Sequence, residues 1–149
     1  MKVTRLLAVA AALGLACAGP VAAADKDAPK SERQRIEADA RAAKEKCKDM
    51  KGNAKDICMA EATGQEKVAK AELALKNKDT PRNRYDVAAA KADMEYGIAK
   101  EKCDDMKGKE KAQCEKDARA ARDSAKKQAR ADRDAAEPRK ERKKEKEAK

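Results

Sequence analysis

The sequence predicts an all-α protein built from two disulfide-stapled antiparallel helical hairpins with a basic, partly disordered C-terminal tail. Three observations support this fold class. A cysteine-bearing stretch occurs twice, the composition favours helices, and apolar residues recur at helical spacing. Ala, Lys, Glu and Arg are abundant, and these residues have high helix propensities. The chain has no Phe, Trp or His, so we expect solvated helices with thin contacts rather than a large apolar core.

The repeated stretch covers residues 42–62, AAKEKCKDMKGNAKDICMAEA, and residues 98–118, IAKEKCDDMKGKEKAQCEKDA. Each copy holds two cysteines separated by ten residues, with a glycine near the middle. The residues are Cys47, Gly52 and Cys58 in the first copy, and Cys103, Gly108 and Cys114 in the second. A glycine just after a helical segment indicates a helix end, because it tolerates the left-handed conformation. Residues equidistant from such a turn face each other, which favours the disulfides Cys47–Cys58 and Cys103–Cys114.

Two other cysteine arrangements are compatible with the sequence. A single long hairpin centred on residues 76–83 would pair Cys47 with Cys114 and Cys58 with Cys103. That layout resembles the twin-cysteine helical hairpins of the mitochondrial import family, although the ten-residue gap here departs from their pattern. Alternatively, an unbroken helix would hold the two cysteines of a copy about 16 Å apart, too far to bond to each other. In the second copy such a helix would continue its apolar stripe onto polar residues, which favours a break at Gly108.

Residues 1–24 have the pattern of a signal peptide cleaved after Ala24. Lys2 and Arg5 precede an apolar run at residues 6–15, which is too short to span a bilayer. Small residues follow and end in an A-x-A cleavage pattern. The sequence therefore predicts export to the periplasm, with no transmembrane segment after cleavage.

Cys17 offers a second processing route. It follows Gly14-Leu15-Ala16, which resembles a bacterial lipoprotein site, so a lipoprotein anchored at Cys17 is the alternative. Cleavage after Ala24 would leave four cysteines. An even number in an exported chain indicates disulfides in an oxidising compartment.

The first hairpin is expected at residues 31–78, after a polar leader at residues 25–30. Ser31 is the predicted N-cap of its first helix and Asn53 that of its second. One apolar stripe comprises Ile36, Ala40, Ala43, Cys47 and Met50. The other comprises Cys58, Ala62, Ala69 and Leu73. Each stripe lies on one helix face, where it can pack against the other.

The second hairpin is expected at residues 79–137. Thr80 is a natural N-cap, and Pro81 suits the first helical position. Its first stripe comprises Tyr85, Ala89, Ala92, Tyr96, Ala99, Cys103 and Met106. The following helix has no large apolar residue after Cys114, so we expect it to fray towards Arg133 before Pro138 ends it.

The last segment, residues 138–149, contains seven basic and three acidic residues. Such a charge run is typical of a solvated, partly disordered tail. It also suits contact with an anionic envelope surface, such as phospholipid headgroups or polysaccharide.

The sequence predicts no enzyme and no cofactor. It contains no His, its glycines form no phosphate-binding loop, and its carboxylates are spread among lysines at helical spacing. Nucleic-acid binding is not expected either, because acids are interspersed with the lysines and aromatics are nearly absent.

A soft-metal site is the third function considered. Cys47 with Met50, and Cys103 with Met106, form C-x-x-M pairs that could offer ligands to Cu(I). In an exported chain without His we favour methionine as a packing residue beside a disulfide, and we predict no metal ligand.

The repeat AKEKC-x-DMKG…C, on an Ala/Lys-rich helical background, resembles a group of small exported proteins of Gram-negative bacteria that are often labelled TolA-like. The resemblance covers most of the chain after residue 24. It implies a bacterial periplasm and supplies no activity.

From these observations we expect a non-enzymatic structural or interaction protein of the cell envelope, with other envelope proteins or anionic surfaces as partners. The alternative is a small ATP-independent chaperone that shields unfolded clients with its amphipathic helices. The sequence does not define the oligomeric state.

Overall fold

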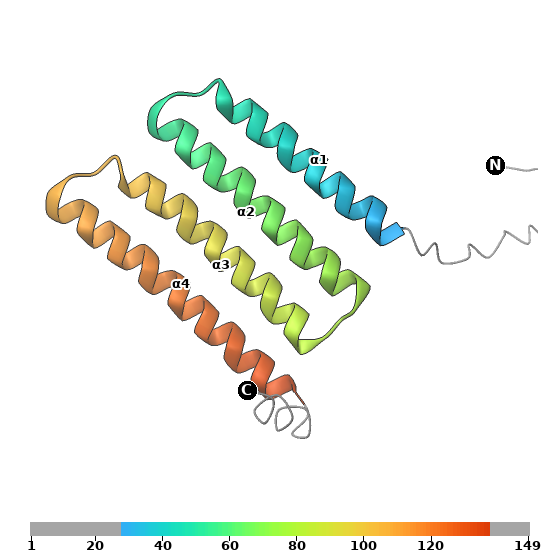
Figure 1. Ribbon diagram of the computed structural model, residues 1–149. Coiled ribbons are helices and arrows are strands. Elements are labelled where there is room, and N and C mark those ends of the chain that lie inside the picture. Colours follow the sequence, from blue (N-terminus) through green and yellow to red (C-terminus); the bar gives the residue numbers. More distant parts are fainter. Residues whose placement is uncertain (1–27, 138–149) are drawn as a thin grey trace, which may run out of the picture.

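The computed structural model describes residues 28–137, which form four helices (Figure 1). They are α1 (Ala28–Lys48), α2 (Gly52–Asn77), α3 (Pro81–Cys103) and α4 (Gly108–Ala136). Consecutive helices are antiparallel, so α1 with α2 and α3 with α4 form the two predicted hairpins, and the all-α class is confirmed. The expected signal peptide, the lipoprotein site at Cys17 and the basic tail lie outside the described residues.

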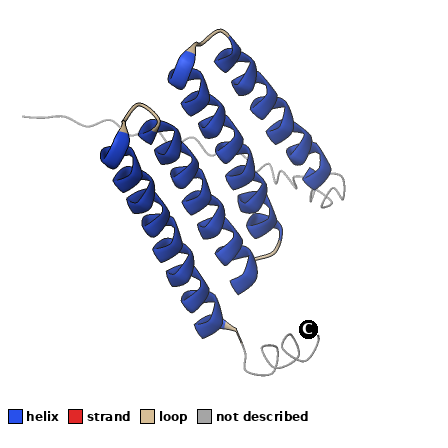
Figure 2. Cartoon of the chain, turned by 60° about the vertical axis from the view of Figure 1, so that its left-hand side comes forward, coloured by secondary structure: helices blue, strands red, loops and turns tan. Residues whose placement is uncertain are grey.

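The four helices lie side by side in chain order and form a single layer, as Figures 1 and 2 show from two directions. Each helix packs against its neighbours in the chain. No other pair among these four makes more than a marginal contact. The layer therefore has two broad faces and two edges, and the edges are formed by α1 and α4.

Small side chains explain this thin packing. The buried apolar side chains are those of Ala40, Cys47, Ala62, Leu73, Ala92, Cys103 and Ala129. Alanine lets helices approach closely but removes little apolar surface from water, and burial contributes about 25 cal/mol per Å². Since so little area is buried, the disulfides and the polar contacts between helices are needed to hold the layer together.

The turns of the two hairpins have nearly the same geometry. Gly52 and Gly108 adopt φ values of 57° and 56°, in the left-handed region that favours glycine. Ahead of each glycine, the Met50 amide donates to the Cys47 carbonyl at 3.1 Å and the Met106 amide donates to the Cys103 carbonyl at 3.0 Å. The sequence repeat is thus also a structural repeat, in which α3 corresponds to α1 and α4 to α2.

The connection between the hairpins is a capped turn. Thr80 is the N-cap of α3, and its hydroxyl accepts a hydrogen bond from the Asn83 amide at 3.0 Å, with Pro81 at the first helical position. The Asn83 side chain donates to the carbonyls of Lys78 at 2.7 Å and Ala74 at 3.1 Å. These bonds tie the start of α3 to the end of α2.

The hairpins pack on each other through α2 and α3. Gly64 is buried in the middle of α2, and Met94 of α3 lies against it. A Cβ atom at this position would lie 2.7 Å from the Cβ and 3.2 Å from the Cα of Met94. No real Cβ is found that close to another carbon, so only glycine permits this approach of the two helices.

Ion pairs join α1 to α2. Glu66 of α2 accepts from Lys44 of α1 at 2.6 Å and from Lys70 at 2.7 Å, and Lys70 also pairs with Glu37 at 3.3 Å. Hydrogen bonds from Lys44 and Lys70 lower the pKa of Glu66 to about 2. The carboxylate therefore stays ionised across the physiological pH range.

Helices α3 and α4 are joined by an ion pair between Lys126 and Asp93 at 2.8 Å and by two stacked cations. The Arg122 guanidinium lies 4.3 Å from the centre of the Tyr96 ring, and that of Arg133 lies 5.1 Å from the Tyr85 ring. Such cation–π contacts contribute about 0.5–1 kcal/mol each at exposed sites. Because Arg133 packs in this way, α4 stays helical through Ala136, and the expected fraying towards Arg133 is wrong.

Two predicted helix starts are also wrong. Helix α1 begins at Ala28, with Pro29 in its first turn, so Ser31 lies inside the helix and residues 28–30 are not a leader. Helix α2 begins at Gly52 with Lys51 as its N-cap, and no side chain caps it. Asn53 therefore does not cap α2, and its Nδ2 atom is buried without a hydrogen-bond partner.

The methionines of the two stripes were placed wrongly as well. Helix α1 ends at Lys48 and α3 at Cys103, so Met50 and Met106 fall in the turns. Their side chains are 40% and 42% exposed instead of packed. The spacing of three and four residues in a stripe does not reveal where its helix ends, and here each helix ends before the last stripe residue.

Candidate functional site

The four cysteines pair within the hairpins. Cys47 is bonded to Cys58 and Cys103 to Cys114, with Cα–Cα distances of 5.6 Å and 5.7 Å that are typical of disulfides. The favoured pairing is therefore present, and the long-hairpin alternative is not. The first cysteine of each pair is fully buried.

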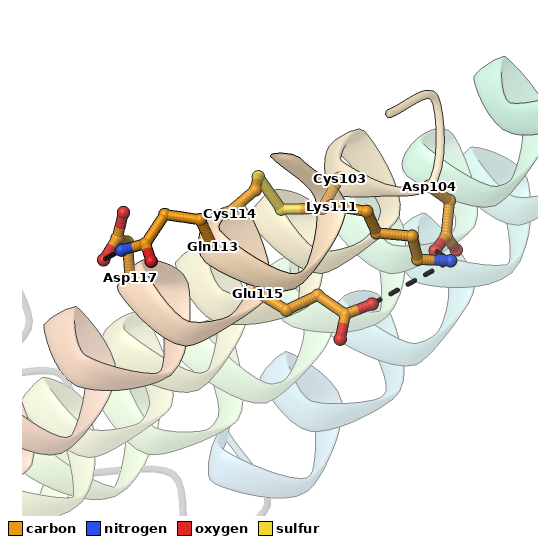
Figure 3. Close-up of a disulfide and its surroundings, with 7 residues drawn as sticks. All are labelled: Cys103, Asp104, Lys111, Gln113, Cys114, Glu115 and Asp117. Carbon is orange, nitrogen blue, oxygen red and sulfur yellow. Dashed lines mark hydrogen bonds and ion pairs between the residues drawn. A yellow bond between two sulfur atoms is a disulfide. The ribbon is translucent and has the colours of Figure 1, made fainter. Parts of the chain in front are cut away.

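Polar contacts surround the second disulfide, as Figure 3 shows. Lys111, at the start of α4, pairs with Asp104 at 2.6 Å and reaches Glu115 at 3.9 Å. The hydrogen bond from Lys111 lowers the pKa of Asp104, and the same contact raises the pKa of Lys111. This charge pair fixes the turn next to the disulfide.

Both disulfides lie at the same end of the layer, where the α1–α2 and α3–α4 turns are neighbours (Figure 1). We call residues 46–55 the Met50 turn and residues 102–111 the Met106 turn. Each contains four lysines, against one acid in the Met50 turn and three in the Met106 turn. This end of the molecule is therefore cationic.

The two turns repeat their exposed residues as well as their buried ones. Besides the cysteines and glycines, the matching pairs are Lys46/Lys102, Asp49/Asp105, Met50/Met106 and Lys51/Lys107, all of them exposed, and Lys55/Lys111, which is half-buried. The cysteines are matched because they form disulfides, and the glycines because of their positive φ. No such structural requirement acts on the exposed lysines and methionines, so their repetition points to a surface property that both turns share.

Most of the lysines at this end make no ion pair. Lys48 pairs with Glu45, and Lys111 pairs with Asp104. The remaining six have no acidic partner among the described residues: Lys46, Lys51, Lys55, Lys102, Lys107 and Lys109. At the α2–α3 turn, by contrast, Lys76, Arg82 and Arg84 are paired with carboxylates, and Lys78 alone of its basic residues at positions 76–84 is not.

Shallow grooves run along the layer. One, of about 440 Å³, lies between α1 and α2 beside the first disulfide and is lined by residues that include Asp39, Ala43, Ala62 and Gln65. Another, of about 400 Å³, lies between α2 and α3 around Gly64. Both are open, and neither brings together a nucleophile with a base that could activate it.

The C-x-x-M pairs do not offer thiolates. All four cysteines of residues 28–137 are in disulfides, whereas Cu(I) prefers thiolate or thioether ligands. In the same residues no group of three or more His, Cys, Asp or Glu side chains could hold a metal ion. None of the described helices is long and apolar enough to cross a membrane.

Comparison of the chain with protein-family models, with curated proteins and with solved structures found no match.

The sequence located the cysteines, the turn glycines, Thr80 and Pro81, but it missed the exposed turn surface. The signal was available, because Lys46, Met50 and Lys51 recur in the second copy at the same offset as the cysteines. The helical spacing assigns both methionines to packing stripes, which hides this surface in the sequence.

Proposed function

We propose that this protein is a periplasmic, non-enzymatic helical protein of the cell envelope with a structural or interaction role. The observation that carries the proposal is a single helical layer closed by two disulfides. Disulfides of this kind persist in oxidising compartments, which include the bacterial periplasm. The resemblance to small exported TolA-like proteins supports the same setting.

An interaction role fits a single layer better than a catalytic role does. Both faces of α2 and α3 remain open along their length, and the described grooves are shallow. A layer of this shape offers much surface for its size but no deep pocket in which water could be excluded from a reaction.

A chaperone role is less well supported. Shielding unfolded clients requires contiguous exposed apolar surface. In the described part of the chain Met50 and Met106 are the exposed large apolar side chains. An aggregation-suppression assay with a model client separates the two roles, and we expect no protection at stoichiometric amounts.

Cell fractionation tests the proposed location. The protein is expressed in a Gram-negative host, the periplasm is released by osmotic shock, and free thiols are alkylated before and after reduction. We expect the protein in the periplasmic fraction, with four thiols that become reactive only after reduction. Recovery from the cytosol with those thiols already free would contradict the proposal.

A further inference from the structure

We propose that the disulfide end of the layer is a docking surface for an anionic phospholipid bilayer, with Met50 and Met106 as paired insertion points. This inference deepens the proposed envelope role by naming a partner, and it rests on that role for its biological setting. The observation behind it is the repetition of exposed, unpaired lysines around two exposed methionines.

The methionines are held in place by rigid structure. Each lies between a disulfide-bonded cysteine and a glycine of positive φ, and its amide is bonded to the carbonyl of that cysteine. The side chains therefore project from fixed turns, and little conformational entropy of the backbone is lost when they contact a surface.

The geometry suits a flat partner. The two turns are separated by two helix spacings, which is roughly 16–20 Å at the usual 8–10 Å between helix axes. Both lie at one end of a single layer, so a planar surface can reach them together (Figures 1 and 2). A compact ligand of small size could contact only one.

Charge and apolar character together favour a bilayer over a soluble polyanion. Each lysine near an anionic leaflet raises affinity by about fivefold. A soluble polymer such as an acidic polysaccharide would bind the lysines equally well, but it would give the methionines nothing apolar to enter. A bilayer interface accepts both kinds of side chain.

The test is flotation of the oxidised protein, residues 25–149, with vesicles of phosphatidylglycerol and phosphatidylcholine, and with pure phosphatidylcholine. We expect binding to the anionic vesicles only, weakening as salt shortens the Debye length below about 8 Å. All variants below share residues 138–149, so any contribution from that segment is the same in each.

Three variants locate the surface. Lys51→Gln with Lys107→Gln should weaken binding about 25-fold, at fivefold for each lysine. Met50→Ser with Met106→Ser should weaken it several-fold without changing charge. The matched control, Lys78→Gln with Lys127→Gln, removes two exposed lysines that have no ion pair and lie away from the turns, and it should change binding by less than about fivefold.

The outcomes decide between surfaces. Equal losses in both lysine variants would show diffuse charge attraction and would overturn the proposal. Unchanged vesicle binding by the methionine variant would also overturn it. So would binding to dextran sulfate that is as tight as binding to vesicles and is unaffected by the methionine substitutions. The vesicle assay does not depend on where the protein resides in the cell. A negative vesicle result therefore does not contradict the proposed periplasmic location. A cytosolic location would contradict that location but would not contradict binding to vesicles.

Discussion

At the scale of single residues, Gly64 sets the distance between the two hairpins. Glycine inside a helix costs about 1 kcal/mol relative to alanine, so a glycine there indicates a packing requirement. This requirement comes from Met94 of α3, whose side chain occupies the space that a side chain at position 64 would fill.

Gly64→Ala should destabilise the protein by about 1–3 kcal/mol, because the added methyl group forces α2 and α3 apart. The matched control is Gly97→Ala on α3, where the nearest atom to an added Cβ is the Ala60 Cβ at 4.0 Å. That substitution should be neutral or stabilising through helix propensity. Urea denaturation followed by circular dichroism measures both, and equal effects would contradict this account of Gly64.

Glu66 makes stability depend on pH. Its folded pKa of about 2 lies below the ordinary value of 4.5, so its contribution is complete above pH 4.5 and is lost as the pH falls towards 2. Because the group is partly exposed, we expect Glu66→Gln to cost about 0.2–1 kcal/mol at neutral pH.

The difference between wild type and Glu66→Gln should shrink as the pH falls through that window. Thermal unfolding measured in steps from pH 7 to pH 2 checks this. Glu61→Gln serves as the control, since Glu61 is exposed on the same helix and accepts a hydrogen bond from Gln65 only. A difference that stays constant down to pH 2 would rule out this role of Glu66.

At the scale of helices, the disulfides secure the two edges of the layer. Among the described helices, α1 packs mainly against α2, and α4 packs mainly against α3. Each disulfide joins such an edge helix to its inner neighbour and closes a short loop, which contributes about 2–3 kcal/mol. The inner pair, α2 and α3, is held by its own packing around Gly64.

Cys47→Ser with Cys58→Ser should therefore release α1 while the other three helices stay protected, and Cys103→Ser with Cys114→Ser should release α4. Hydrogen–deuterium exchange resolved by peptide gives the protection of each helix. Full reduction of the wild type should remove much of the helical circular dichroism. Uniform loss of protection in either double variant would show that the layer unfolds as one unit.

How far the sequence predicts this structure differs between elements. The hairpins, their turns and Thr80 were predictable because the signals are local: cysteine spacing, glycine position and a capping hydroxyl before a proline. The packing of α2 on α3 was not, since it depends on which helix lies opposite Gly64. The lysine–glutamate pairs between α1 and α2 were also missed, because long side chains reach partners that no spacing rule identifies.

The candidate surface at the disulfide end is also only partly predictable from the sequence. The sequence displays Lys46, Met50 and Lys51 twice, but only the helix ends at Lys48 and Cys103 reveal that both methionines are exposed. The cationic end of the layer then follows from the fold, which places both turns together.

At the scale of the whole molecule, the edge of the layer that α4 forms lacks the apolar stripe of α2. On α2 the stripe that includes Gly64 also carries Ile57, Val68 and Leu75, and all three are half-buried. The corresponding residues of α4, 56 positions later, are Gln113, Ser124 and Ala131, and all three are exposed. A third hairpin thus finds no apolar stripe on α4 to pack against.

Introducing the apolar stripe of α2 at the corresponding positions of α4 should create a new interface. Gln113→Ile, Ser124→Val and Ala131→Leu together would give α4 an exposed apolar edge, and two copies should associate through it. Sedimentation velocity over a range of concentrations detects the dimer. The control triple variant, Gln113→Asn, Ser124→Thr and Ala131→Ser, should sediment as the wild type does. Absence of association in the first variant would contradict this explanation of the polar edge.

The pairing of consecutive cysteines has one more consequence, which concerns the order of oxidation. Four cysteines allow three pairings, and only one of them joins each cysteine to its nearest neighbour in the sequence. A chain that emerges with its N-terminus first presents Cys47 and Cys58 before Cys103 appears. Once the proposed cleavage after Ala24 has removed Cys17, the first bond can close without a competitor. An oxidant alone should then suffice for maturation, with no bond to be reshuffled by an isomerase.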